Sequence, residues 1–203
     1  MVGMEAFSAR AYEDVWVEEI AERAGISRGL LYHYFPSKRD FYVAVTRAAA
    51  EEARALTEPD PTLDSRARLH TGIGAFLAYA ESRSQGFLTA YRGSLVGDPE
   101  VRAIIEDGRR QQAERILSVV AGTSKPPKVL HLAVRGWIAF AQDVTAEWLQ
   151  ARRPSRKTVT DLLFHALLGA IGAAAETDPQ VATVLLDRSL SSGSGHQGRV
   201  GQA

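Results

Sequence analysis

Apolar residues recur at helical spacing along almost the whole chain, and no stretch alternates apolar and polar residues for long enough to predict a strand. The segments between the breaks in this pattern are rich in Ala, Leu, Arg and Glu, which favour helices. The pattern therefore predicts an all-α fold. The breaks are few and far apart: Gly25, Pro36, Glu58–Pro61, Gly97–Pro99, Lys125–Pro127 and Arg153–Pro154.

Two short helices joined by a tight turn are predicted near the start of the chain. The segment 17–24 has its apolar residues at helical spacing, which gives the first helix one apolar face. Gly25 stands where a left-handed backbone conformation ends a helix, and Ser27 is placed to cap the next one. Pro36 forces the residue before it out of helical geometry. This arrangement predicts a helix-turn-helix unit.

The second helix of this unit has two different faces. Leu31 and Phe35 lie four residues apart and are expected to share a buried face, whereas most polar-tipped residues fall on the other side. We expect that side to contact DNA, because arginine can bind a guanine edge with two hydrogen bonds and tyrosine can contact a thymine methyl group and a phosphate. A third helix beginning after Ser37 would offer its free backbone N–H groups to a phosphate. The predicted DNA-binding residues are Ser27, Arg28, Gly29, Tyr32, His33, Tyr34 and Lys38.

Charge is unevenly distributed around this unit. The whole chain of 203 residues has 24 basic and 24 acidic residues and is neutral. Residues 25–48 nevertheless carry a local charge of +3, because Arg28, Lys38, Arg39 and Arg47 face only Asp40 in the sequence. A local basic patch is typical of a DNA-binding surface even when the net charge is zero.

The segment VEEIAERAGISRGLLYHYFPSKRDFYVAV, residues 17–45, resembles the DNA-binding segment of the TetR (AcrR-like) family of transcriptional regulators. The likeness rests on the turn glycine and capped helix of 25–29, on 31–32 and 34–35, and on the serine and lysine of 37–38. The resemblance implies an all-helical remainder that binds a small molecule and forms a homodimer. It also implies a ligand-responsive regulator, most often a repressor, that binds a palindromic double-stranded DNA operator.

The start of the chain departs from the family pattern. The first helix is expected to be shortened, with Phe7 and Tyr12 matching its end, and its missing turns would otherwise brace the recognition helix. Trp16 stands where a small capping hydroxyl is usual, and Ala11 stands where a glycine is usual. Either this start is truncated, or the DNA-binding head is weakened. The second reading gives an alternative function, a helical ligand-binding protein with impaired DNA recognition.

We expect three parts along the chain: a helix-turn-helix DNA-binding domain at 1–47, a ligand-binding and dimerisation domain at 48–190, and a disordered tail at 191–203. A pocket for a largely apolar effector is expected between the middle helices and a helix at 128–150. The predicted pocket residues combine aromatic walls with polar anchors: Phe76, Tyr79, Phe87, Tyr91, Arg92, Trp137, Phe140, Gln142 and Asp143.

Two late segments predict helix packing across a two-fold axis. In 128–150 apolar residues recur with spacings of four and three from Leu130 to Trp148, as in a helix that packs at a shallow angle, within its own chain or against a partner. In 158–176 small residues would let another helix approach closely. The need to bind two DNA half-sites favours a dimer. The predicted interface residues are Leu162, Ala166, Gly169 and Ala173.

Composition excludes several kinds of chemistry. The chain has no cysteine, so it has no disulfide and no thiolate nucleophile. The longest apolar stretch, 162–175, is shorter than a membrane span needs, and the N-terminus has no secretory pattern, so we expect a cytoplasmic protein without membrane contact. His131 and His165 could pair with Asp143 or Asp161, but no metal-ligand spacing, phosphate loop or nucleophile elbow is present. We therefore expect neither an enzyme nor a bound metal or cofactor.

Overall fold

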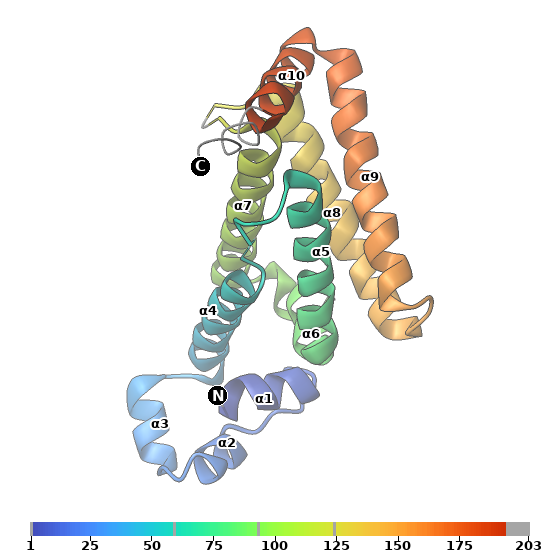
Figure 1. Cartoon of the computed structure of the whole chain (residues 1–203). Coiled ribbons are helices and arrows are strands. Elements are labelled where there is room, and N and C mark those ends of the chain that lie inside the picture. The colour runs from blue at the N-terminus through green and yellow to red at the C-terminus, as the bar shows by residue number, and fades with distance from the viewer. Residues whose placement is uncertain (1, 59, 93, 124, 194–203) are drawn as a thin grey trace, which may run out of the picture.

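The fold, in a computed structural model that describes residues 2–58, 60–92, 94–123 and 125–193, consists of helices joined by turns and loops, with no strand among those residues (Figure 1). The prediction of an all-α protein is confirmed. The helices in chain order are α1 (Val2–Ala9), α2 (Val17–Arg23), α3 (Arg28–Tyr34), α4 (Lys38–Leu56), α5 (Ser65–Ser82), α6 (Ser84–Arg92), the 3₁₀ helix η1 (Ser94–Gly97), α7 (Pro99–Ala121), α8 (Lys128–Ala151), α9 (Arg156–Thr177) and α10 (Pro179–Gly193).

Local turn chemistry sets most of the helix boundaries. Gly25, between α2 and α3, has a φ of +68°, the left-handed conformation that its place in the sequence predicts. Phe35, before Pro36, is extended, with φ −129° and ψ 97°. Side-chain caps are also present: the predicted one at Ser27 and three more at Ser37, Asp64 and Asp98, where in each case a side-chain oxygen accepts a backbone N–H of the first helical turn.

The end of the chain differs from its predicted boundary. α10 continues to Gly193, so it includes the first residues of the segment expected to be a disordered tail. Helical hydrogen bonding carries on past the last apolar residues there, which composition alone did not indicate. The rest of that expected tail, 194–203, lies outside the described residues.

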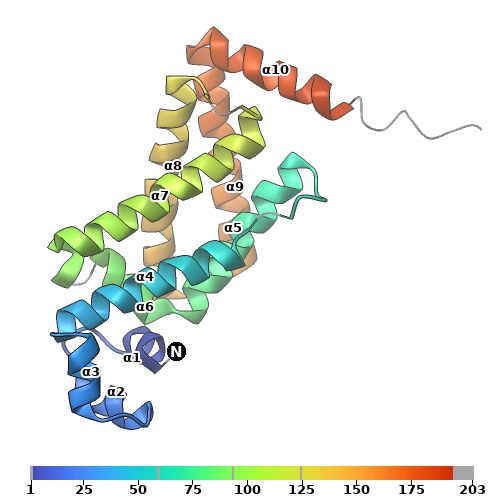
Figure 2. The same cartoon turned by 90° about the vertical axis from the view of Figure 1, so that its left-hand side faces the viewer.

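The helices form a small head, α1 to α3 with the start of α4, at one end of a larger body (Figures 1 and 2). The body core lies between α5, α7, α8 and α9, and its fully buried side chains include Leu77, Leu130, Ile138, Leu163 and Leu167. α9 is, by length and composition alone, the one described helix that could cross a membrane. Its inner face, however, is buried against α5 and α8.

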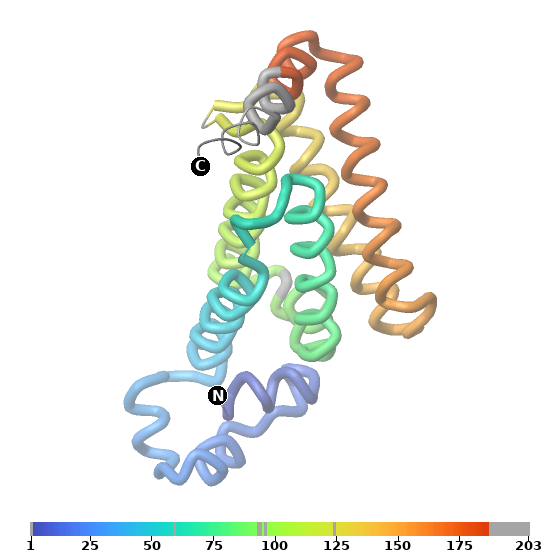
Figure 3. The backbone as a smooth tube through the Cα atoms, viewed as in Figure 1, coloured from blue at the N-terminus to red at the C-terminus, as the bar shows by residue number. Residues whose placement is uncertain are grey.

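The head has a second hydrophobic cluster, and the body helps to build it. Phe7 of α1, Leu31 of α3 and Phe41 of α4 are buried in this cluster together with Val101 and Ile104, which belong to the first turns of α7. The expected domain boundary at residue 47 falls inside α4, which runs as one continuous helix from the head along the body (Figure 3). The head core is therefore completed by a helix that is distant in sequence.

A second join between head and body is the contact of α1 with α6. At Gly86 on α6 a Cβ atom would lie 3.2 Å from Ser8 Oγ and 3.4 Å from the carbonyl oxygen of Phe7. These two helices consequently meet at that point through backbone atoms and the short Ser8 side chain.

An ion pair provides the third join. Arg39, in the first turn of α4, donates to both carboxylate oxygens of Asp98 over 2.6 and 2.9 Å. Asp98 is also the N-cap of α7 and accepts the backbone N–H groups of Glu100 and Val101. The hydrogen bonds from Arg39, aided by those from the cap, hold the pKa of Asp98 below its ordinary value.

Val101→Ala tests whether the head core depends on α7. The substitution removes two buried methyl groups from the head cluster, so we expect the free energy of unfolding to fall by about 2 kcal/mol. Hydrogen exchange should also become faster at the backbone amides of α3. The neighbouring exposed Arg102→Ala should change stability by less than about 0.5 kcal/mol. Faster exchange confined to the body would contradict this description of the head core.

Asp98→Asn separates the ion pair from the helix cap, because asparagine caps helices about as well as aspartate. Asp98 has a lowered pKa in the folded state, so its charge stabilises the fold at all pH values above its unfolded pKa near 4, and this stabilisation is lost as pH falls through the folded pKa. We expect the variant to melt below wild type at pH 7, and the difference to shrink as pH falls below about 4 and to vanish below the folded pKa of Asp98.

The matched control is Asp64→Asn at the N-cap of α5, where the aspartate caps a helix and has no recorded ion pair among the described residues. Equal destabilisation by the two substitutions at pH 7 would mean that capping, not the ion pair with Arg39, explains the loss.

Candidate functional site

The outer face of α3 carries the predicted polar-tipped residues. Arg28, Gly29, His33 and Tyr34 are exposed, and Tyr34 has 69% of its surface exposed. The Arg28 Nε atom lies 3.1 Å from a carboxylate oxygen of Glu18. This face is therefore open to solvent, with one cation held near an acidic side chain.

The remaining predicted residues of this unit are more constrained. Tyr32 is half-buried, and its ring lies 5.4 Å from the Arg28 guanidinium carbon. Ser27 caps α3 by accepting the N–H of Leu30. Lys38 is also half-buried, since its Nζ donates to the carbonyl oxygen of Glu13 over 3.1 Å and lies 4.5 Å from the centre of the Tyr12 ring. No feature of the sequence pattern predicted that this lysine would contact the loop between α1 and α2.

The inner face of α3 is fixed by packing. Leu31 is buried, and the Phe35 ring meets the Phe41 ring edge-on at 5.0 Å. α1 takes part in the same cluster through Phe7. Trp16, at the N-cap position of α2, makes no side-chain cap hydrogen bond and is 64% exposed, so the expected departure at this position is real.

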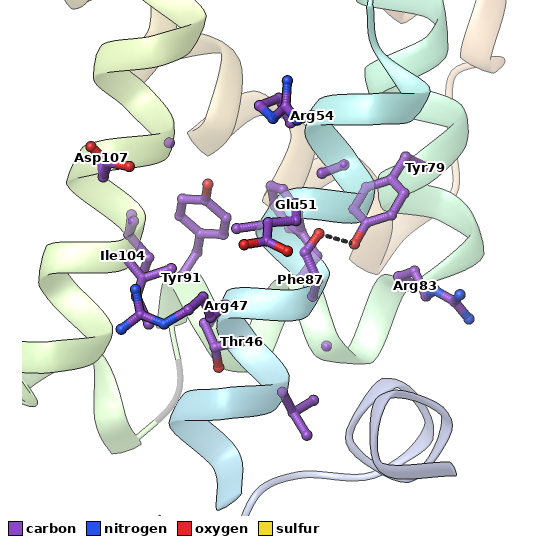
Figure 4. A pocket seen from close by; sticks show the side chains of 18 of the residues that line it. Thr46, Arg47, Glu51, Arg54, Tyr79, Arg83, Phe87, Tyr91, Ile104 and Asp107 are labelled. Carbon is purple, nitrogen blue, oxygen red and sulfur yellow. Dashed lines mark hydrogen bonds between the residues drawn. The ribbon is translucent and has the colours of Figure 1, made fainter. Parts of the chain in front are cut away.

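A cavity of about 710 Å³ lies between the head and the body. Its walls come from α1, α4, α5, α6 and α7, and α8 contributes only Gln142 (Figure 4). Five of the predicted pocket residues line it: Phe76, Tyr79, Phe87, Tyr91 and Gln142. The expected location was closer to α8, and the observed cavity is shifted toward the head.

A smaller cavity of about 50 Å³ adjoins the larger one. Trp137 lines only this smaller cavity, whereas Phe76 and Gln142 line both. The smaller cavity lies between α5, α7, α8 and α9, which is the location that the sequence analysis expected for the whole pocket.

Three predicted pocket residues line neither cavity. Arg92 donates to Asp143 over 2.8 Å and to Glu147 over 2.9 Å on the outer surface. Phe140 is 44% exposed on the outward face of α8. The orientation of α8 about its own axis explains why Phe140 and Asp143 line neither cavity. It turns Trp137 toward the body core and turns Phe140 and Asp143 away from it.

The sequence analysis missed the wall that α4 provides. Val45, Ala49 and Ala53 lie four residues apart and line the larger cavity along one side of this helix. Ile104 of α7 also lines this cavity (Figure 4). The signal was present as a repeated small or β-branched residue at helical spacing, but only the packing of α4 against α7 indicates what that stripe faces.

A chain of polar contacts crosses the cavity wall. Gln142, which is buried, donates to the Tyr91 hydroxyl over 2.9 Å and accepts from Arg109 over 2.6 Å. Arg109 also contacts Glu106, which binds Arg135 of α8. Burial raises the pKa of Tyr91 to about 12, so its hydroxyl stays protonated at neutral pH and can donate to an acceptor in the cavity.

Tyr79 stabilises the wall between α5 and α4. Its hydroxyl donates to the carbonyl oxygen of Ala49 over 2.9 Å (Figure 4). Burial raises the pKa of Tyr79 to about 12. Nearby, Arg83 donates to both carboxylate oxygens of Glu52, which adds a second link between these helices.

The histidines considered for catalysis are not paired as the sequence analysis allowed. His131 and His165 are exposed on α8 and α9. The Asp161 carboxylate instead contacts His70 at 2.9 Å and Lys157 at 2.7 Å. The hydrogen bonds from Lys157 and His70 lower the pKa of Asp161.

The outer faces of α8 and α9 form an apolar surface on two helices that pack side by side. Leu132 and Leu162 are 72% and 51% exposed. Of the predicted interface residues, Leu162, Gly169 and Ala173 are exposed and Ala166 is half-buried. The α8 residues between Leu130 and Trp148 that repeat with spacings of four and three are mostly buried in the chain's own body core, so that repeat describes packing within the chain.

Two family models match this chain. The model for bacterial regulatory proteins of the tetR family matches residues 2–45, and the model for a tetracyclin repressor-like C-terminal domain matches residues 65–170. The first match covers the head, and the second covers most of the body.

Individual relatives give the same result. A tetR-family transcriptional regulator from Streptomyces coelicolor has a similar structure, with a TM-score of 0.85, 30% identity, and coverage of 94% of this chain and 85% of its own. A TetR-like regulator from Rhodococcus sp. RHA1 shares the fold at 21% identity, with a TM-score of 0.63 over 84% of this chain and 92% of its own. The curated transcriptional activator FasR of Mycolicibacterium smegmatis is 29% identical over 160 residues, which are 75% of this chain and 71% of FasR.

Both family matches thus coincide with the two parts of the fold, the helix-turn-helix head and the helical body with its cavity, and the chain belongs to the TetR family of ligand-responsive, DNA-binding transcriptional regulators.

Proposed function

We propose that this regulator binds its operator through the outer face of α3 and releases it when a small molecule fills the larger cavity, and so acts as a repressor. The observation that carries the proposal is the position of the cavity, which has head helices α1 and α4 on one side and body helices α5, α6 and α7 on the other. Any molecule that fits only one spacing of these walls also selects one position of the head.

The proposed DNA contacts are the residues predicted from the sequence. Arg28 and Gly29 in the first turn of α3 are exposed, as base contacts in the major groove require. Tyr32, His33 and Tyr34 extend that surface toward the sugar and phosphate backbone. Ser27 and Lys38 stand at the N-termini of α3 and α4, where free backbone N–H groups also favour a phosphate.

Arg28 would have to exchange partners on binding. It lies beside Glu18 in the free protein, and a guanine edge or a phosphate would replace that carboxylate. The head is otherwise prepared for docking, because Leu31 and Phe35 fix the inner side of α3. This prepared surface favours a DNA-binding protein over the alternative of a helical ligand-binding protein with impaired DNA recognition.

The effector would act through the joins between head and body. The cavity is bordered by Phe7 and Tyr42 of the head cluster and by Ile104, which the head cluster shares with α7. A largely apolar molecule bound there would change the spacing of α4 and α7, and hence the position of α3. By linkage, DNA must lower the affinity for such an effector by the same factor that the effector lowers the affinity for DNA.

Two copies are needed to read a palindromic operator, and the apolar faces of α8 and α9 are the proposed dimer interface. A two-fold axis beside these helices would bury Leu132, Phe140 and Leu162 against the partner. The exposed Gly169 and Ala173 would allow the two α9 helices to approach closely. Burial in a dimer also explains why α9 is so apolar without any contact with a membrane.

One relative differs from the proposed repression, since FasR is named an activator. Repression is favoured here because α3 is already arranged for DNA binding in the free protein. Effector binding between head and body would alter that arrangement. Family regulators are soluble cytoplasmic proteins and not enzymes, and we propose the same for this chain.

Arg28→Ala and Lys38→Ala should have different effects on DNA binding. The first should reduce discrimination between operator and unrelated DNA by ~1–3 kcal/mol, because it removes a base contact. The second should weaken binding to all sequences alike and reduce the salt slope by about one. Electrophoretic mobility shifts with the DNA beside the protein's own gene, at several salt concentrations, would measure both effects. Equal binding of wild type and Arg28→Ala to that DNA, or no DNA binding by wild type, would refute the assignment.

Leu162→Arg should convert the dimer to a monomer, because it would bury an unpaired charge on each side of the proposed interface. Sedimentation velocity would show the change in mass. The matched control is Leu56→Arg, since Leu56 is 60% exposed at the end of α4 and lies outside the α8–α9 face. A dimer that survives Leu162→Arg, or that is lost equally in the control, would place the interface elsewhere.

A further inference from the structure

The smaller cavity differs in charge from the larger one. Among the described residues, its lining includes two cations, Arg68 of α5 and Arg115 of α7, and no acidic side chain. The other polar members are the neutral Thr57, Gln112 and Gln142, and the rest of the lining is apolar. The larger cavity, by contrast, has both acidic and basic side chains around it, among them Glu51, Arg54 and Asp107 (Figure 4).

Arg115 stands at the junction, because it lines both cavities. Its side chain is only 24% exposed, and its Nη1 atom donates to the backbone carbonyl of Arg54 over 3.1 Å. The nearest carboxylate, that of Glu58, is 3.5 Å away and mostly exposed. Burial therefore outweighs the attraction of Glu58 and lowers the pKa of Arg115, with the charge of Arg54 acting in the same direction.

Arg68 has an unused donor. Its Nε atom is buried and has no hydrogen-bond acceptor in the described part of the chain. Asp60, an exposed residue outside the cavity, is the acidic group whose charge interacts with it. Buried donors are rarely left without a partner, because the lost hydration is not recovered.

Several other arginines in this protein have a carboxylate at hydrogen-bond distance. Arg83 binds Glu52, and Arg109 binds Glu106 at 2.6 Å. The smaller cavity is thus distinct in having two arginines and no carboxylate among its described lining residues. The buried Arg68 Nε donor, which has no acceptor in the described part of the chain, favours an anion in this space.

We propose that the effector is an organic acid with an apolar body, and that its carboxylate binds Arg68 and Arg115 in the smaller cavity. A carboxylate matches the planar fork of a guanidinium, whereas a cation would be repelled and a neutral group would gain no attraction from the charge of the two arginines. This inference rests on the proposed function, since it names the chemical class of the molecule that fills the cavity.

The apolar part of the acid can extend from the smaller cavity into the larger one. A space of about 50 Å³ holds a carboxylate and a few carbon atoms. The apolar part of the acid then passes Phe76 and Gln142, which line both cavities, and continues into the 710 Å³ cavity, which Phe87 and Ile104 line. The acid consequently bridges the body core and the head side of α4.

Isothermal titration calorimetry on the full-length protein without DNA tests the inference. The probes are hexanoate, decanoate, tetradecanoate and 2-naphthoate, each below its micelle concentration, with decan-1-ol and decylammonium as matched neutral and cationic molecules. We expect at least one acid of suitable length to bind, and decanoate to bind about tenfold or more tightly than decan-1-ol. Decylammonium should bind weakest of the three.

Arg68→Gln and Arg115→Gln should each lower the affinity for the preferred acid by about tenfold or more and leave the affinity for decan-1-ol nearly unchanged. The matched control is Arg66→Gln on the same helix, where the guanidinium lies 4.8 Å from the centre of the Phe164 ring and lines neither cavity. Arg68→Gln removes a buried donor without an acceptor, so this variant is expected to fold, and its melting temperature should be at least that of Arg66→Gln.

Three results would overturn the inference: none of the acids binds, decan-1-ol binds as tightly as decanoate, or Arg66→Gln loses as much affinity for the acid as Arg68→Gln. Mobility shifts measured separately distinguish these results from a failure of the proposed function. A protein released from DNA by some other molecule while no acid binds would overturn only this inference. Acid binding by a protein that binds no DNA would instead remove the regulator function.

Discussion

The first turns of α7 belong to two parts of the molecule at once, and the relation between head and body depends on them. Val101 and Ile104 complete the head core, and Asp98 at the helix N-cap holds Arg39 of α4. The same helix continues into the body core through Leu117 and Val120. A helix that is packed into two cores cannot move relative to one of them without a response in the other, because protein interiors are close-packed.

The larger cavity is lined by α4 and by α7, the helix that is packed into both cores. Its walls include Ile104 of α7 and the Val45–Ala49–Ala53 side of α4, so its contents act on the two helices that define the head position. Regulation through the proposed effector cavity would not require a long path, since this cavity and the head core share residues. The distance from the cavity to the proposed DNA-binding face is covered mainly by α4, which is one unbroken helix of 19 residues.

Much of the fold could be predicted because its signals are local. Gly25, Ser27 and Pro36 set the helix-turn-helix unit through backbone conformation and capping, which depend on a few neighbouring residues. The rotation of α8 was harder to predict, since Trp137 and Phe140 are both aromatic and three residues apart. Only packing shows that Trp137 faces the core and Phe140 faces outward.

The cavity chemistry could not be predicted from the sequence for a related reason. Arg68 and Arg115 are separated by 47 positions and resemble the many other arginines of a helical protein. What distinguishes them is that both line the smaller cavity, whose described lining residues include no carboxylate, and this is a property of the folded arrangement of α5 and α7. The role of α4 as a wall was missed in the same way. Whether the predicted α3 residues contact DNA stays a prediction.

Gly86 has a mechanical consequence that follows from the missing side chain. Most helix contacts include rotatable side chains that can absorb part of a displacement, but α6 meets α1 here through backbone atoms and the short Ser8 side chain. A shift of α6 would therefore reach α1 with almost undiminished amplitude. The size of the residue at position 86 sets the stiffness of this contact, and it offers a single place at which the sensitivity of the regulator could be tuned by evolution or by an engineer without touching α3.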